Sequence, residues 1–189
     1  MVRTHNEMSA ATISLLKVIK PLTAKEEHTA VAAAVKYLGQ ELSQRYQVFP
    51  AELRIEKPPK PRAVPKRTIA VLIFDYDNRR TTEVLLSALG RSLRRTDLTG
   101  FQPAFLGTEI SQAREIAERD ARVAQVIRAR GVFASAFGAD RDGEPGARIV
   151  GLRYAAVDRR HVLRLLGEAI VDLSKQELVN FVDMQREEK

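Results

Sequence analysis

A continuous apolar run in the middle of the chain is its most constraining feature. Thr68-Ile69-Ala70-Val71-Leu72-Ile73-Phe74 carries no charge and stops abruptly at Asp75-Tyr76-Asp77-Asn78. An unbroken run of β-branched and aliphatic residues predicts a strand buried on both faces, which is typical of the centre of a sheet. Functional residues of such sheets tend to follow the carboxyl end of a strand. The acids after Phe74 therefore either perform chemistry or only reverse the chain.

The length of the chain favours one main domain with an appendage. It has 189 residues, and domains commonly run to about 100–150. We expect a helical arm over residues 1–48, a basic proline-rich linker over 49–67, and an α/β domain with a C-terminal helix over 68–189. The expected fold class is α/β (α+β), with a two-layer or three-layer mixed sheet packed against helices and preceded by the helical arm.

Two helices are expected in the arm. The first ends before Pro21, because proline cannot continue a helix. Thr23-Ala24-Lys25-Glu26 has the pattern of a capping box and predicts a second helix that runs to about Tyr46. Its apolar stripe, which includes Ala34 and Leu38, could dock a partner. We favour the simpler interpretation, in which the stripe covers this protein's own sheet.

Apolar periodicity predicts the order of the remaining elements. After the first strand we expect a helix from Thr81, a short edge strand over 100–106 and a long helix over about 109–130. Strands are expected over 132–138 and 148–157, on either side of a loop over 139–146. A tight turn over 158–161 leads to a segment at 162–166 that either completes a meander or opens a helix. Ser174-Lys175-Gln176-Glu177 matches a capping box and predicts a terminal helix to about Arg186.

This order of elements resembles the TolB amino-terminal-like and CsgG-like domains. The resemblance covers residues 67–170, and rests on the first strand with its basic start, the later strand at 129–138, the turn at 140–146 and the strand at 149–158. It implies a non-enzymatic module for interaction or assembly, a subunit or adaptor of a larger bacterial complex. Protein partners are then expected, with homo-oligomerisation through the arm or a sheet edge as a further option.

The basic composition leaves open an alternative, a nucleic-acid-binding protein. The chain has 31 Lys plus Arg against 24 Asp plus Glu, a formal net charge of +7, and cations that neutralise phosphates drive such binding. The candidate contacts lie in the linker, after the first strand and in the segment that follows it: Lys57, Lys60, Arg62, Lys66, Arg67, Arg79, Arg80, Arg91, Arg94 and Arg95.

A second alternative is a metal-dependent phosphatase or nuclease that uses Asp75 and Asp77. Such enzymes need several converging carboxylates or a specific turn after the strand, and Asn78-Arg79 does not supply that turn. We therefore favour an interpretation in which Asp77 or Asn78 caps the next helix. No catalytic residue, metal site or cofactor is expected.

Cysteine and long apolar segments are both missing from the sequence. The chain has no cysteine, which excludes disulfides, thiolate metal sites and cysteine nucleophiles, and fits a reducing compartment. No segment approaches the roughly 20 apolar residues that span a bilayer. The expected location is cytoplasmic, or periplasmic if a signal peptide has been removed.

Overall fold

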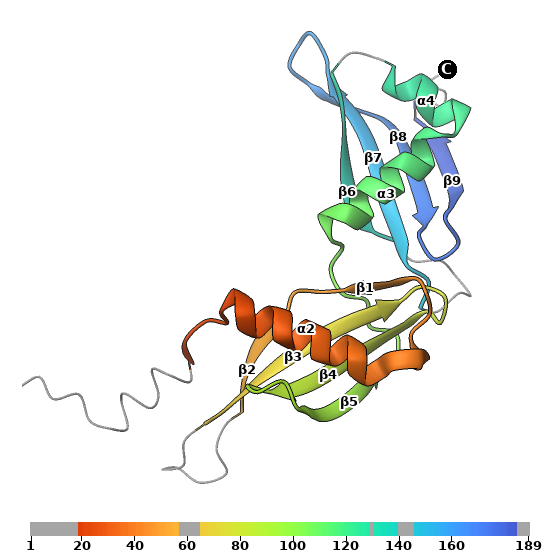
Figure 1. Ribbon diagram of the computed structural model, residues 1–189. Helices are drawn as coiled ribbons and strands as arrows, with labels where there is room; N and C mark the ends of the chain where they lie inside the picture. Colours follow the sequence, from red (N-terminus) through yellow and green to blue (C-terminus); the bar gives the residue numbers. More distant parts are fainter. Residues whose placement is uncertain (1–18, 57–64, 129–130, 140–145, 185–189) are drawn as a thin grey trace, which may run out of the picture. The chain divides into compact units, whose positions relative to one another are not determined.

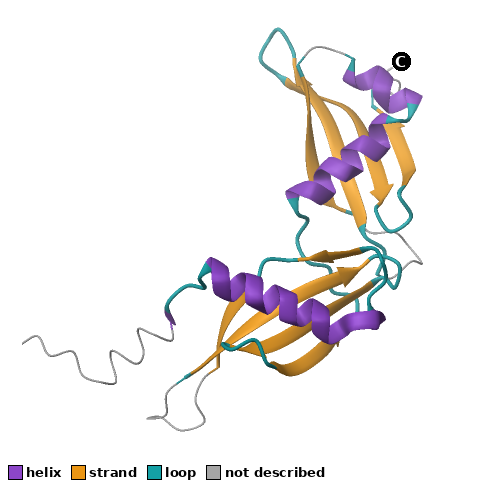
Figure 2. Cartoon of the chain, in the orientation of Figure 1, coloured by secondary structure: helices purple, strands orange, loops and turns teal. Residues whose placement is uncertain are grey.

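The computed structural model describes residues 19–56, 65–128, 131–139 and 146–184. The helix predicted before Pro21 and most of the predicted loop at 139–146 lie outside the described residues. The chain forms two compact units, Met1–Phe74 with Thr81–Leu98, and Asp75–Arg80 with Thr99–Lys189 (Figure 1). Each unit is an antiparallel sheet with helix packed against it (Figure 2). The α+β class and the helical N-terminal part are confirmed, with two antiparallel sheets in place of one mixed sheet.

The described residues of the first unit form one main helix and five strands. Its elements are α2 (Ala24–Leu38), a 3-10 turn (Gly39–Glu41), β1 (Tyr46–Val48), β2 (Glu52–Glu56), β3 (Lys66–Asp75), β4 (Arg80–Ser87) and β5 (Ser92–Leu98). The sheet has the order β1-β3-β4-β5, and β2 also pairs with β3. The apolar run Thr68–Phe74 therefore lies in an inner strand, as its composition predicted.

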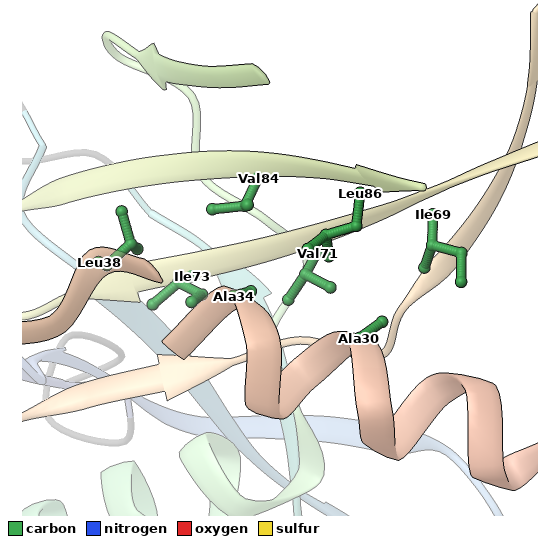
Figure 3. Close-up of a cluster of buried hydrophobic side chains, with 8 residues drawn as sticks. All are labelled: Ala30, Ala34, Leu38, Ile69, Val71, Ile73, Val84 and Leu86. Atoms are coloured by element: carbon green, nitrogen blue, oxygen red, sulfur yellow. The ribbon is translucent and has the colours of Figure 1, made fainter. Parts of the chain in front are cut away.

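Two alanines and a leucine on α2 form the core contact of the first unit. Ala30, Ala34 and Leu38 recur every four residues and are almost fully buried. They pack on alternate residues of two neighbouring strands (Figure 3), namely Ile69, Val71 and Ile73 of β3 and Val84 and Leu86 of β4. The capping box is present, because the Thr23 hydroxyl accepts from the Glu26 N–H (3.2 Å) and Glu26 accepts from the Thr23 N–H (2.8 Å). The helix thus covers this protein's own sheet.

The expected boundary at residues 49–67 does not separate the two units. β2 pairs in antiparallel register with β3, from Glu52 opposite Ala70 to Glu56 opposite Lys66. The linker was predicted because prolines lack a packing face, but its flanks are strands of one sheet. The proline-rich part itself, residues 57–64, lies outside the described residues.

A hairpin replaces the helix predicted from Thr81. β4 and β5 pair from Thr81 opposite Leu98 to Leu86 opposite Ser92. The short run Val84-Leu85-Leu86 fits the helical and the extended period equally well, and only pairing with neighbouring strands decides between them. Gly90, with φ at 76°, allows the chain to reverse between the two strands.

The second unit places two helices on a four-stranded meander. α3 (Gly107–Glu118) and α4 (Ala121–Ile127) precede β6 (Val132–Gly138), β7 (Ile149–Val157), β8 (Leu163–Asp172) and β9 (Glu177–Asp183). The strand order is β6-β7-β8-β9, and every neighbouring pair is antiparallel. Both helices contact β8 and β9, and α3 also contacts β7. Segment 162–166 completes the meander.

Three further predictions in this region are wrong. Residues 101–106 form no strand. The single helix expected over 109–130 is interrupted, because Asp120 adopts an extended conformation and caps α4 by accepting from the Arg122 N–H. The terminal helix is β9. Here Ser174 lies in a tight turn in which Asp172 accepts from the Ser174 N–H (2.8 Å) and the Lys175 N–H (3.1 Å).

No helix within the described ranges combines the length and the apolar character that crossing a membrane requires.

Candidate functional site

Asp75, the last residue of β3, closes the turn that follows this strand. Asp75 is buried, and its carboxylate accepts from the Asn78 backbone N–H (3.0 Å) and from the Asn78 side-chain amide (2.9 Å). The chain continues into β4, so the prediction that Asp77 or Asn78 caps a helix is wrong. The Asp75 side chain instead accepts from one backbone N–H, that of Asn78, in a strand-to-strand turn. Nowhere in the described parts of the chain do three or more metal-ligating side chains cluster.

The predicted basic residues are divided between the two units and the part of the chain outside the described residues. Lys57, Lys60 and Arg62 lie outside the described residues, and Arg79 and Arg80 belong to the second unit. In the first unit, Lys66, Arg91 and Arg94 are exposed.

Two of these cations have structural contacts within the first unit. Arg67 donates to the Lys20 carbonyl and lies 3.3 Å from a Glu26 oxygen, which ties the start of β3 to the start of α2. Arg95 forms salt bridges with Glu41 (2.5 Å) and Asp97 (3.3 Å). Both guanidinium groups are therefore already engaged within the first unit.

The second unit contains a fully buried ion pair that sequence reasoning did not find. Arg148 and Glu109 are at most 1% exposed. The guanidinium donates to both carboxylate oxygens, each at 2.9 Å, and the Tyr76 hydroxyl donates to the same carboxylate at 2.7 Å. Buried charges are tolerated when they are paired and hydrogen-bonded in this way.

The ion pair organises the irregular segment that precedes α3. Arg148 donates to the carbonyls of Pro103 and Ala104, and its guanidinium lies 4.2 Å from the centre of the Phe105 ring. Glu109 accepts from the Leu106 N–H at 2.9 Å. A segment without secondary structure of its own is thereby held in one conformation.

Glu109 remains ionised at neutral pH in this setting. Burial acts to raise the pKa of its carboxyl, but the hydrogen bonds from Arg148, the Leu106 N–H and the Tyr76 hydroxyl outweigh burial and lower the pKa below its ordinary value. The charge is therefore fixed and structural. Its function is to hold Arg148 and the segment before α3.

An open groove lies between that segment and the last residues of β6. It has a cavity volume of about 540 Å³ and is lined on one side by Gly100 and residues 102–105, and on the other by residues 136–139. Ile110 and Arg148 complete the lining. Most of these side chains are apolar, and the buried guanidinium fixes the wall that contains Phe105.

Phe137 is held firmly on the β6 side of the groove. It lies opposite Gly151 on β7, where an added Cβ would come within 2.2 Å of the phenyl ring. The Arg153 guanidinium lies 4.3 Å from the ring centre. Glycine at position 151 therefore lets the ring lie flat on the neighbouring strand.

β6 itself is an outer strand with an unusual composition. Val-Phe-Ala-Ser-Ala-Phe-Gly has seven residues without a charge or a proline. The outer strands β5 and β9 both carry charged residues, β2 alternates them, and β1, which is also uncharged, has only three residues. Charges and prolines are the usual protection of a sheet edge against pairing with another chain. β6 lacks both.

Alternation along the ladder shows which backbone groups of β6 face outward. The Ala139 N–H donates to the Ile149 carbonyl (3.5 Å), in register with the β6–β7 pairs. Hydrogen-bonded and non-hydrogen-bonded pairs alternate in antiparallel strands, so Ala134, Ala136 and Gly138 direct their N–H and C=O groups away from β7. Within the described chain, no turn, loop or cap hydrogen bond of the backbone engages these three residues.

Sequence reasoning found β6 but not the groove. Its strand was predicted from alternating large and small residues, and the absence of charge was a readable sign of an unprotected edge. Arg148 and Glu109 gave no local signal, because their significance comes from pairing across 39 positions. Neither residue type is expected inside a core without a partner.

Comparisons with known proteins do not identify a family. No family model matches, and no curated protein matches. Among solved structures, the chain is similar to the C-terminal domain of YpeB from Bacillus megaterium, with 11% sequence identity and a TM-score of 0.27. The similarity covers 83% of this chain and 62% of that one, and is too weak to carry a functional argument. The TolB-like and CsgG-like resemblance stays a prediction.

Proposed function

We propose that this chain is a non-enzymatic protein-binding module, and that its second unit takes an extended segment of a partner protein alongside β6. The observation that carries the proposal is the uncharged, proline-free outer strand beside a groove lined mainly by apolar residues. Addition of a strand to an exposed sheet edge is a recurrent mode of peptide recognition. The role of a subunit or adaptor in a larger assembly follows from it.

The backbone of β6 supports such pairing. Ala134, Ala136 and Gly138 offer outward-facing N–H and C=O groups, spaced as an incoming strand requires. Small side chains at these positions leave room for the partner's side chains. A partner strand would gain backbone hydrogen bonds whatever its sequence, so the groove must supply specificity.

The groove supports selection of apolar residues at every second position. Successive side chains of a strand point to opposite faces, so only alternate residues of an added segment would face Phe105, which lies on the Gly138 side of β6. Ile110 forms part of the same lining. We expect a consensus with apolar residues two apart, and not the three-and-four spacing of a helix.

The test uses peptides selected from a random library displayed on phage. Binding of a selected peptide is measured by fluorescence polarisation for the wild type and for Ala136→Pro, which removes an outward N–H without removing a bond to β7. We expect at least about tenfold weaker binding, from loss of a backbone hydrogen bond and from steric interference by the ring. Ser135→Ala, which alters a side chain of the same strand and keeps every N–H, should bind like the wild type.

Several outcomes would decide against the proposal. Selection of a helical spacing, or equal binding by wild type and Ala136→Pro, would show that β6 does not pair with the ligand. Ala134→Pro serves as the second variant if Ala136→Pro unfolds. If the added strand is β6 of a second copy, light scattering should give twice the monomer mass for the wild type and the monomer mass for Ala136→Pro.

A further inference from the structure

The β7–β8 hairpin exposes a group of large apolar side chains at one end of the second unit. Val157, Leu163 and Leu165 are 54%, 61% and 41% exposed, and Phe133 on β6 is 46% exposed. Antiparallel sheets usually present polar residues on a face that meets water. Four large apolar residues in one place require a different explanation.

The strand register places these side chains on one face. Phe133 pairs with Ala155 and Ala155 pairs with Leu165, while Val157 pairs with Leu163 two residues further along. Paired residues project to the same side of a sheet, and so do residues two apart. Ala155 itself is only 6% exposed. We call Phe133, Val157, Leu163 and Leu165 the tip patch.

Arginines adjoin the tip patch at the turn. Arg159, Arg160 and Arg164 are exposed, and the single acid of the turn is engaged internally. Asp158 accepts from the backbone N–H groups of Arg160 (2.8 Å) and Val162 (3.0 Å), and its other oxygen accepts from Arg164 (3.2 Å). No salt bridge within the described residues engages Arg159 or Arg160.

From this combination we infer that the hairpin tip binds an anionic lipid surface. Exposed apolar side chains enter the boundary between headgroups and acyl chains, while neighbouring arginines keep their charges among the phosphates. Residues 153–168 contain four arginines and two acids, which gives the tip a net charge of +2 with histidine neutral. Two copies meeting tip to tip would instead place like charges together. The inference is independent of the β6 edge.

The experiment uses co-sedimentation of the whole protein with lipid vesicles. We expect binding at low salt to phosphatidylcholine vesicles that contain about 30% phosphatidylglycerol, and little binding to pure phosphatidylcholine. Arg159→Gln with Arg160→Gln should weaken the binding about 30-fold, since each arginine near an anionic surface contributes about fivefold. Leu163→Asp should abolish it.

Matched control variants come from the first unit. Arg91→Gln with Arg94→Gln removes the same net charge from exposed positions, and Leu89→Asp changes an apolar side chain that is 85% exposed. Both controls should bind vesicles nearly as well as the wild type. An equal loss in the arginine control would show that only the overall charge matters, and would overturn the inference.

A tryptophan at the tip distinguishes insertion from simple electrostatic attraction. The chain has no tryptophan, so Val162→Trp introduces a single fluorophore at a position that is 54% exposed. We expect a blue shift of its emission with anionic vesicles and none with double-stranded DNA. An unshifted spectrum despite binding, or no vesicle binding at low salt, would contradict the inference. Val162→Asp replaces Leu163→Asp if the latter fails to fold.

Discussion

Arg148 combines a full charge with complete burial. Its three guanidinium nitrogens contact one carboxylate and two backbone carbonyls, and no part of the side chain reaches solvent. A buried pair of this kind adds little net stability over a well-packed apolar pair, but removal of one partner leaves an uncompensated charge. The residue therefore serves to fix the geometry of the segment before α3.

Arg148→Met should destabilise the protein by about 3–5 kcal/mol, because the Glu109 carboxylate stays buried without its cation. Urea unfolding measures the change. The control is Arg153→Met, which removes an ion pair with Glu168 whose arginine side chain is 52% exposed; we expect about 1 kcal/mol or less. Addition of Glu109→Gln to the Arg148 variant should restore part of the loss, and a smaller loss for Arg148→Met than for Arg153→Met would contradict this account.

Tyr154 is a buried residue with an unsatisfied hydroxyl. Its oxygen has no hydrogen-bond partner among the described residues, and burial, with a contribution from Glu118, raises the pKa of its phenol to about 12. The pKa of Tyr154 in the folded protein lies above the unfolded value of about 10. The contribution of this phenol to the free energy of unfolding is therefore complete below pH 10 and is lost as pH rises towards 12.

Tyr154→Phe should raise the free energy of unfolding by about 1 kcal/mol at pH 7, because it removes the buried hydroxyl. It should also flatten the fall in stability between pH 10 and 12. Urea titrations at several pH values measure both effects. Tyr37→Phe, at a position that is 50% exposed, should change stability by less than about 0.5 kcal/mol. A destabilised Tyr154→Phe protein would indicate that the hydroxyl has an ordered partner.

At the scale of single elements, α2 depends on small residues. Ala34 is fully buried against the sheet, so a larger side chain would displace the helix or the strand beneath it. Ala34→Leu should cost about 1–3 kcal/mol. Ala32→Leu, on the exposed side of the same helix, should be nearly neutral. Thermal unfolding compares the two, and equal effects would mean that α2 does not pack through this face.

Element types could be predicted where local signals agree with the tertiary structure. The capping box at Thr23 was sufficient to predict a helix, and the apolar run was sufficient to predict β3. The alternation of large and small residues was sufficient to predict β6. β4 and β9 were mistaken for helices, because short apolar runs fit either period and Ser174 matches a helix cap by type. Their conformation is decided by strand partners that lie at least five residues away, as in the pairing of β9 with β8.

At the scale of the whole molecule, the sequence indicated the class but not the division into units. Proline-rich composition predicted a boundary at residues 49–67, whereas the units divide at Phe74, Arg80 and Leu98. Composition indicates how stiff a segment is. It does not indicate whether the strands before and after that segment pair with each other. The groove likewise depends on residues far apart in the chain, and could not be predicted from any one segment.

The turn between β3 and β4 has a consequence for synthesis. It joins strands of the first unit, yet residues 75–80 belong to the second, and the Tyr76 hydroxyl binds a carboxylate 33 positions downstream. On the ribosome, the turn emerges before Glu109, and Glu109 before Arg148, with delays on the order of seconds. Until Glu109 has been synthesised, the Tyr76 hydroxyl has no carboxylate to bind. During that interval the nascent β3–β4 hairpin is accessible to a chaperone.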